Sequence, residues 1–229
     1  MALIAEVLMD AELQKDFELS REHFYKFLAG IFFGPVTKGL HAIFSNCEHA
    51  EMLKGMFAAE TVALFEEFRN EGPTPAVVQE FENLFRVPGP WYTTPYESVF
   101  MDTKEVAGKA VEGLLYGESA HDVERFYRKF GLKIGGSSPD LPDYIGVELS
   151  FMSHLAKLSV DPKSGFKASA LIETQKAFLE KHLGRWVPQF ADRLAEKAKA
   201  PYYKGVAKML KEFLKKDLEL LGGENVTSQ

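Results

Sequence analysis

Histidine and cysteine are the side chains that most often hold metals or carry protons, and this 229-residue chain has six histidines and one cysteine. No two histidines are four residues apart, the spacing at which two imidazoles on one helical face share a metal ion. The closest approach to a ligand cluster is His41, Cys47, Glu48 and His49. Cys47 is equally well explained as a small, partly buried residue, and a lone cysteine forms no disulfide within the chain. We therefore expect no metal site.

Pairs of titratable residues give no better case for catalysis. Glu66 and Glu67 are neighbours, and Glu180 and His182 lie two residues apart, so on a helix the partners point in different directions. The glycine and serine run 135–138 could curl its amides around an anion, but a flexible linker explains it better. The glycine-rich, P-loop, nucleophile-elbow and zinc-protease signatures are missing from the sequence. We expect no catalytic residue, no cofactor and no enzyme activity.

Residues 79–101, QEFENLFRVPGPWYTTPYESVFM, are the stretch most suggestive of binding. The stretch starts as an amphipathic helix, with Phe81, Leu84 and Phe85 on one stripe. Prolines and a glycine then interrupt helix and strand alike. The resulting loop carries aromatic side chains that a solvated connection rarely exposes, namely Trp91, Tyr92, Tyr96 and Phe100. An aromatic loop held by prolines is a candidate binding surface.

Composition limits the classes of protein and partner. The chain is 46% hydrophobic and 13% aromatic, enough for a large core. A net charge of -6 and a pI near 5.6 disfavour a nucleic-acid surface. No apolar window reaches the roughly 20 residues that cross a bilayer, and Glu6 and Asp10 fall where a secretory signal needs basic and then apolar residues. We expect a cytoplasmic protein that binds no nucleic acid and inserts into no membrane.

Helical periodicity dominates the sequence, and strand alternation is nearly absent. We expect an all-α protein with no sheet. Ser20 is placed to cap the first clear helix, and Thr74 with Pro75 to start the helix that enters 79–101. The helix at 143–158 is apolar around most of its circumference and should be largely buried. The predicted helices cover residues 20–33, 40–44, 51–69, 75–85, 103–116, 119–130, 143–158, 166–182, 186–198 and 202–221.

A composition change divides the chain into two parts. Residues 131–142 replace helical periodicity with glycine, serine and proline, which indicates a hinge. We expect an N-terminal helical unit at 1–130 that carries the aromatic loop, a hinge at 131–142, a C-terminal helical unit at 143–221 and a frayed tail at 222–229. Because identical units can dock on another copy as well as on their own chain, we expect mainly monomer with some domain-swapped dimer.

Two segments carry short motifs in a fixed order. The first holds FENLF at 81–85, PGP at 88–90 and PYES at 95–98, and the second holds PDYIGVELSFM at 142–152. These motifs, with matches at 21–35 and 178–186, resemble those of the TorD/DmsD family of cytoplasmic chaperones over roughly residues 20–220. That family usually has histidine where this chain has Tyr144. A phenol keeps a hydrogen bond but not a protonation change near neutral pH.

The resemblance implies a two-part, TorD-like helical bundle that assists maturation of a molybdenum-cofactor oxidoreductase. The implied partners are the twin-arginine signal peptide and the apo form of the catalytic subunit, held back from export until the cofactor is loaded. Such a peptide offers two arginines and then an apolar run, so its receptor needs an apolar groove with carboxylates at one end. The candidate peptide-binding residues are Phe81, Glu82, Leu84, Phe85, Pro90, Trp91, Tyr92, Pro95, Tyr96, Glu97, Ser98, Phe100, Asp143, Tyr144 and Glu148.

Three alternatives stay open on the sequence. On periodicity alone, Phe81, Leu84 and Phe85 fit a core better than a groove, which would leave 91–100 for direct contact. Asp143 follows Pro142 at a helix start, where a carboxylate is stabilising without any ligand. The chain as a whole could instead be a nucleotide- or small-molecule-dependent protein with a site near 135–143, or a helical adaptor that docks on a folded partner.

Overall fold

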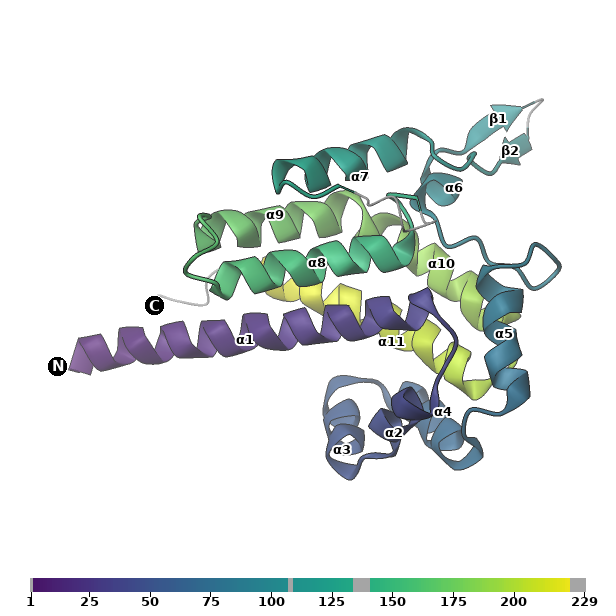
Figure 1. The fold of residues 1–229 in the computed structure, drawn as a ribbon, viewed down its shortest axis with the longest axis horizontal. Coiled ribbons are helices and arrows are strands. Elements are labelled where there is room, and N and C mark those ends of the chain that lie inside the picture. Colours follow the sequence, from purple (N-terminus) through teal and green to yellow (C-terminus); the bar gives the residue numbers. More distant parts are fainter. Residues whose placement is uncertain (1, 107–108, 134–140, 223–229) are drawn as a thin grey trace.

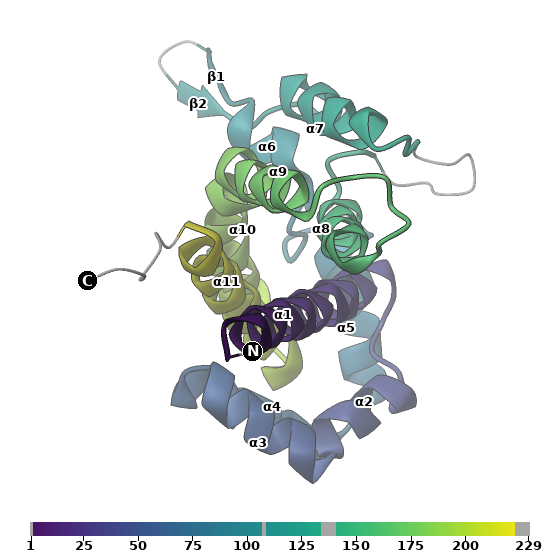
Figure 2. The same cartoon turned by 90° about the vertical axis from the view of Figure 1, so that its left-hand side faces the viewer.

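A computed structural model describes residues 2–106, 109–133 and 141–222 of the chain, and it confirms the all-α class (Figure 1). The central bundle combines the first helix with the last four, while three short helices lie below it and one covers its upper side (Figures 1 and 2). The helices are α1 (Ala2–Phe33), α2 (Lys38–Ser45), α3 (Cys47–Met56), α4 (Ala59–Glu71), α5 (Pro75–Phe85), α6 (Glu97–Met101), α7 (Glu118–Lys129), α8 (Ile145–Val160), α9 (Ala168–Lys181), α10 (Leu183–Lys197) and α11 (Pro201–Gly222).

Several helix ends follow the local sequence. Thr74 caps α5 by accepting the N–H of Val77, and Pro75 occupies its first turn, as predicted. The prediction for Ser20 is wrong, because α1 begins well before it and the Ser20 hydroxyl donates to the Asp16 carbonyl within the helix at 2.8 Å. A serine that bonds back one turn stays compatible with a helix interior.

The predicted helix at 51–69 is two helices, α3 and α4, separated at Phe57 and Ala58. Phe57 leaves the helical conformation and its ring lies 7% exposed in the core. Glu212 of α11 then accepts the N–H of Ala58 at 2.8 Å and the hydroxyl of Thr61 at 2.5 Å. The start of α4 is therefore capped by a residue from the far end of the chain.

The predicted helix at 103–116 is wrong. An antiparallel hairpin replaces it, with β1 (Lys104–Val106) paired to β2 (Lys109–Val111), and Lys104 lies opposite Val111. The other regular elements of the described residues are helices. Gly113 follows it, and a Cβ there would lie 2.0 Å from the Ser98 carbonyl oxygen. Only glycine allows this close approach of the loop to α6.

The core is continuous across the predicted hinge. α1 packs along α8, and α11 packs against both α10 and α4, so helices from 1–130 contact helices from 143–221 (Figure 1). α8 is largely buried, as predicted. Most of the hinge, residues 134–140, lies outside the described residues. The division into two units and the domain-swapped dimer therefore stay predictions.

A buried ion cluster joins three of the bundle helices. Arg21 of α1 pairs with Asp217 of α11 at 2.5 Å and with Glu18 at 2.9 Å, and it donates to Gln175 of α9 at 2.5 Å. Tyr25 also donates to Asp217. All of these side chains are buried. Since a buried charge must be paired, the cluster fixes how α1, α9 and α11 sit against one another.

Candidate functional site

The two motif segments meet where α6 and α8 begin. Tyr96 and Tyr144 form an isolated antiparallel bridge. The N–H of Glu97 donates to the Asp143 carbonyl at 3.0 Å, and the N–H of Ser98 donates to the Asp143 carboxylate at 2.9 Å. The N–H of Ile145 donates to the Pro95 carbonyl at 3.0 Å. Asp143 therefore precedes α8 and also accepts hydrogen bonds from the first two N–H groups of α6.

Three carboxyl groups lie inside this junction. Glu97, Asp143 and Glu148 are at most 2% exposed. His182 contacts Glu97 at 2.9 Å through Nδ1, and the Trp186 indole donates to Glu148 at 3.1 Å. Burial raises the pKa of each carboxyl group, and the nearby Glu97 charge raises the pKa of Glu148 further. Burial in the junction therefore disfavours the charged form of all three carboxyl groups, and none of the three is open to solvent.

Tyr144 has a structural contact of its own. Its hydroxyl donates to the Phe32 carbonyl at the end of α1. Its ring packs against Phe33 and Tyr96, with centroids 5.9 and 5.3 Å away, and the Arg86 guanidinium lies 5.4 Å from its centroid. Tyr144 is fully buried and joins the start of α8 to the end of α1.

The structure divides the predicted peptide-binding residues by exposure. Trp91 is 44% exposed, and Pro90 is exposed beside it. Glu82, Tyr92 and Tyr96 are half-buried. The expected apolar groove of 81–100 is mostly core, because Phe100 packs on Trp186 and Phe190, and Phe85 packs on Phe32. The buried members are Phe81, Leu84, Phe85, Pro95, Glu97, Ser98, Phe100, Asp143, Tyr144 and Glu148.

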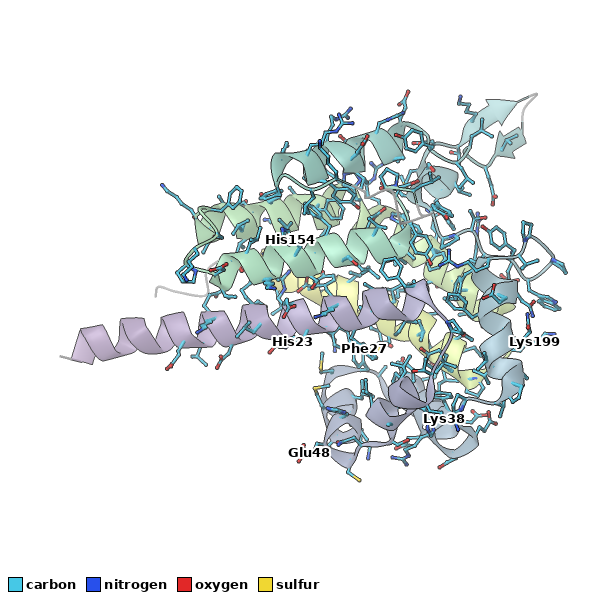
Figure 3. The ribbon with its side chains drawn as sticks, in the orientation of Figure 1. His23, Phe27, Lys38, Glu48, His154 and Lys199 are labelled. Atoms are coloured by element: carbon cyan, nitrogen blue, oxygen red, sulfur yellow. The ribbon has the colours of Figure 1, made fainter. Side chains whose placement is uncertain are left out.

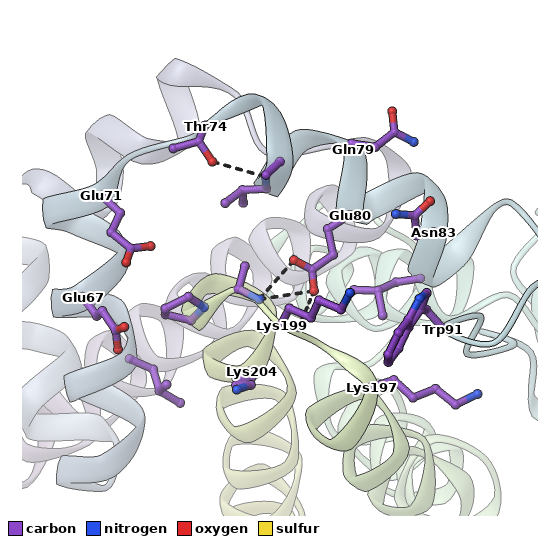
Figure 4. Close-up of a pocket in the computed structure, with 16 residues that line it drawn as sticks. Glu67, Glu71, Thr74, Gln79, Glu80, Asn83, Trp91, Lys197, Lys199 and Lys204 are labelled. Atoms are coloured by element: carbon purple, nitrogen blue, oxygen red, sulfur yellow. Dashed lines mark hydrogen bonds between the residues drawn. The ribbon is translucent and has the colours of Figure 1, made fainter.

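Trp91 stands at the edge of an open cleft of about 640 Å³ between α4, α5 and the start of α11, which we call the Trp91 cleft (Figure 4). Lys199, labelled beside α5 in Figure 3, places its Nζ 4.2 Å from the Trp91 ring centroid. Lys197 donates to the Tyr92 carbonyl at 2.5 Å. Together these contacts hold the aromatic loop against the α10–α11 connection.

The walls of the Trp91 cleft differ in charge. The two carboxylate oxygens of Glu80 accept hydrogen bonds from the backbone N–H groups of Lys199 and Ala200, at 2.5 and 3.0 Å. Glu80 therefore binds the connection between α10 and α11. Glu67 and Glu71 lie on the α4 wall and are exposed, and neither has an ion pair within the described part of the chain (Figure 4). They are one helical turn apart, on the same face. This wall can therefore bind cations.

Sequence reasoning missed the Trp91 cleft. The pair Glu66 and Glu67 gives no signal, because neighbours on a helix point in different directions, whereas the four-residue spacing of Glu67 and Glu71 places both on one helical face. The role of His182 in the junction had no local signal, because its partner Glu97 is 85 residues away.

Two predicted absences concern metals and membranes. Within the described residues, no three acidic, histidine or cysteine side chains are arranged to hold a metal ion. His41 and His49 instead contact backbone carbonyls, those of Arg69 at 3.0 Å and Ile43 at 3.2 Å. Over the same part of the chain, no helix is both long and apolar enough to span a membrane. The run 135–138 lies outside the described residues.

Comparison with known proteins places the chain in a family. The family model described as nitrate reductase delta subunit matches residues 55–192. Chaperone protein TorD of Shewanella pealeana is 24% identical over 89% of this chain and 90% of its own length. Chaperone protein TorD of Shewanella piezotolerans is 23% identical over 96% and 100%. A solved structure from Archaeoglobus fulgidus, described as a redox enzyme maturation protein, is 22% identical with a TM-score of 0.47 and covers 85% of this chain and 93% of its own. The chain therefore belongs to the nitrate reductase delta subunit family and is a TorD-type chaperone rather than an enzyme.

Proposed function

We propose that this chaperone acts in the cytoplasm, where it binds the twin-arginine signal peptide of a molybdenum-cofactor oxidoreductase and assists maturation of that subunit before export. The observation that carries the proposal is the Trp91 cleft, where an exposed aromatic ring stands across from two carboxylates that form no ion pair with any described residue. Membership of a family of maturation chaperones supports the class of client.

The peptide's two arginines match the α4 wall. A guanidinium binds a carboxylate through two parallel hydrogen bonds, and Glu67 and Glu71 can each receive one arginine. Lys204 on the facing α11 wall opposes this binding, because it brings a like charge to the same cleft. Replacing Glu67 and Glu71 by glutamine should therefore weaken binding, and Lys204→Ala should strengthen it.

Magnitudes indicate what the cleft contributes. An exposed ion pair gives about 0.2–1 kcal/mol, so the two carboxylates mainly select arginines. Burying a large apolar side chain gives roughly 1.5–3 kcal/mol. Several apolar contacts are therefore needed to reach a micromolar Kd, near about -8 kcal/mol, after the cost of ordering the peptide. Trp91 supplies one of them.

Calorimetric titration of the chaperone with twin-arginine signal peptides from molybdoenzymes of the same host tests the proposal. We expect wild type to bind with micromolar affinity and the Glu67→Gln, Glu71→Gln variant to bind several-fold more weakly. The difference in affinity between the two proteins should be smaller at high salt, because salt screens exposed ion pairs. Glu118→Gln, which removes an exposed carboxylate on α7, is the matched control. No heat with any such peptide well above micromolar concentration refutes the proposal. Binding of a client that lacks its signal peptide would favour the adaptor alternative.

A further inference from the structure

The ring of Trp91 already has a cation on one face. The Nζ atom of Lys199 lies 4.2 Å from the ring centroid, and both side chains line the Trp91 cleft and are exposed (Figure 4). Among the described residues, no carboxylate forms an ion pair with this ammonium, so the ring is the partner of its charge. A tryptophan face attracts cations through its π electrons. The protein itself therefore identifies this face as a cation site.

The backbone of Lys199 is fixed, whereas its side chain is held weakly. Its N–H donates to the Glu80 carboxylate at 2.5 Å, and the N–H of Ala200 donates to the same carboxylate at 3.0 Å. The side chain ends in an exposed contact of cation and ring, which changes an equilibrium constant only about two- to fivefold. The ammonium can therefore leave the ring without any change in the backbone, and another cation can take its place.

The Trp91 cleft has cation sites on two opposite sides. Glu67 and Glu71 lie on the α4 wall, and Trp91 lies across from them (Figure 4). The α4 wall receives two guanidinium groups only if both arginines of a peptide point to it. In an extended chain, successive side chains point to opposite faces. Two adjacent arginines of an extended peptide therefore face opposite walls, one toward the carboxylates and the other toward the ring.

We propose that Trp91 binds one of the two arginines of the signal peptide and that Lys199 is the internal cation that this arginine displaces. The inference rests on the proposed function and adds the place of the second arginine. A guanidinium is flat and weakly hydrated, so it stacks on an aromatic face better than the compact, strongly hydrated ammonium of lysine. Lys199 thereby lowers the affinity for every ligand and excludes those that bind the ring less well than its own ammonium.

Removing the internal cation should strengthen binding. In calorimetry, Lys199→Ala should bind a twin-arginine peptide about two- to fivefold more tightly than wild type, because no cation has to leave the ring. The matched control is Lys129→Ala. Lys129 is also exposed and lies 4.9 Å from the ring centroid of Phe126, but it is on α7, outside the Trp91 cleft. Both variants lose one positive charge, so an equal gain in both would be an effect of net charge and would overturn the inference.

A double-mutant cycle separates competition for the ring from simple charge repulsion. If Lys199 competes for the ring, Lys199→Ala should strengthen binding by the wild-type protein but leave the affinity of Trp91→Leu unchanged. The same gain in both backgrounds would mean that Lys199 only repels the peptide, which contradicts the inference. Trp91 is 44% exposed, so its replacement should leave the fold intact, and circular dichroism checks this.

Two peptides, each with a different arginine replaced by glutamine, test the two walls. Replacing one arginine should abolish the effect of Trp91→Leu on affinity, and replacing the other should abolish the effect of Glu67→Gln, Glu71→Gln. Acrylamide quenching of tryptophan fluorescence gives a second measurement that needs no variant, provided that the peptides lack tryptophan. The chain has two tryptophans, and Trp186 is fully buried, so the quenching reports Trp91. Only a peptide that keeps the ring-bound arginine should protect Trp91.

The outcomes separate the two proposals. Absence of binding to wild type refutes the proposed function and the inference together. Binding that Lys199→Ala does not strengthen overturns the inference and leaves the proposed function standing. The same holds if both arginines depend on Glu67 and Glu71 and the bound peptide leaves Trp91 open to acrylamide, because the ring would then receive no arginine.

Discussion

Replacing Glu148 by glutamine should change how the stability of the protein depends on pH. The Glu148 carboxyl is fully buried beside Glu97 and accepts a hydrogen bond from Trp186. Burial, followed by the Glu97 charge, raises the pKa of Glu148 well above its ordinary value. The folded protein therefore holds a proton that the unfolded chain has released at the same pH. A glutamine keeps the size and the hydrogen bond to Trp186 but needs no such proton.

The sign and size follow from proton linkage. A group whose pKa is raised on folding contributes its full stability below its unfolded pKa, and that stability is lost as the pH rises to its folded pKa. The loss is about 1.4 kcal/mol per pH unit. The free energy of unfolding of wild type should therefore fall from about pH 4.3, the ordinary glutamate value, up to the raised pKa of Glu148. For Glu148→Gln, the free energy of unfolding should fall less steeply with pH, by about that slope. The buried carboxyl groups of Glu97 and Asp143 should leave some dependence on pH.

Urea unfolding between pH 5 and pH 8, followed by circular dichroism, measures this difference. The matched control is Glu173→Gln, because Glu173 is an exposed carboxylate inside α9 and surface substitutions away from helix ends change stability by about 0.5 kcal/mol or less. Parallel stability curves for wild type and Glu148→Gln over this range would refute the reasoning. They would mean that Glu148 is ionised in the folded protein in spite of its burial.

Three further changes test how the site is supported, each by the free energy of urea unfolding. Arg21→Ala should cost about 3–5 kcal/mol because it leaves buried carboxylates unpaired. Its control, Lys54→Ala, removes an exposed ion pair and should cost at most about 1 kcal/mol. Similar losses in the two variants would contradict a structural role of the buried ion cluster. Gly113→Ala should cost at least about 1–3 kcal/mol through its clash with the α6 backbone, while Gly30→Ala, with open space around it, should be neutral or stabilising. Tyr144→Phe should cost about 0.5–1.5 kcal/mol through the lost hydrogen bond to α1, and an unchanged stability would show that this bond contributes nothing.

The sequence by itself determined the helical class and the order of most helices. Apolar residues at helical spacing are a local signal, as in the stripe of Phe81, Leu84 and Phe85, and burial confirms that this stripe faces the core. Thr74 and Pro75 likewise mark the start of α5 through their own backbone chemistry. The short motifs identified the family, because they need only sequence order to be seen.

The tertiary structure alone decided which residues face solvent and which carry the site. Glu97, Asp143 and Glu148 could have lined a peptide groove on their spacing, but α6 packs against α7 and α10 and is hydrogen-bonded to the start of α8, and these contacts bury them. After the hairpin of β1 and β2, Gly113 approaches α6 closely, and no local pattern predicts this tertiary contact. The Trp91 cleft joins helices that are far apart in the chain. Burial and charge pairing depend on such distant neighbours, so a periodic pattern cannot specify them.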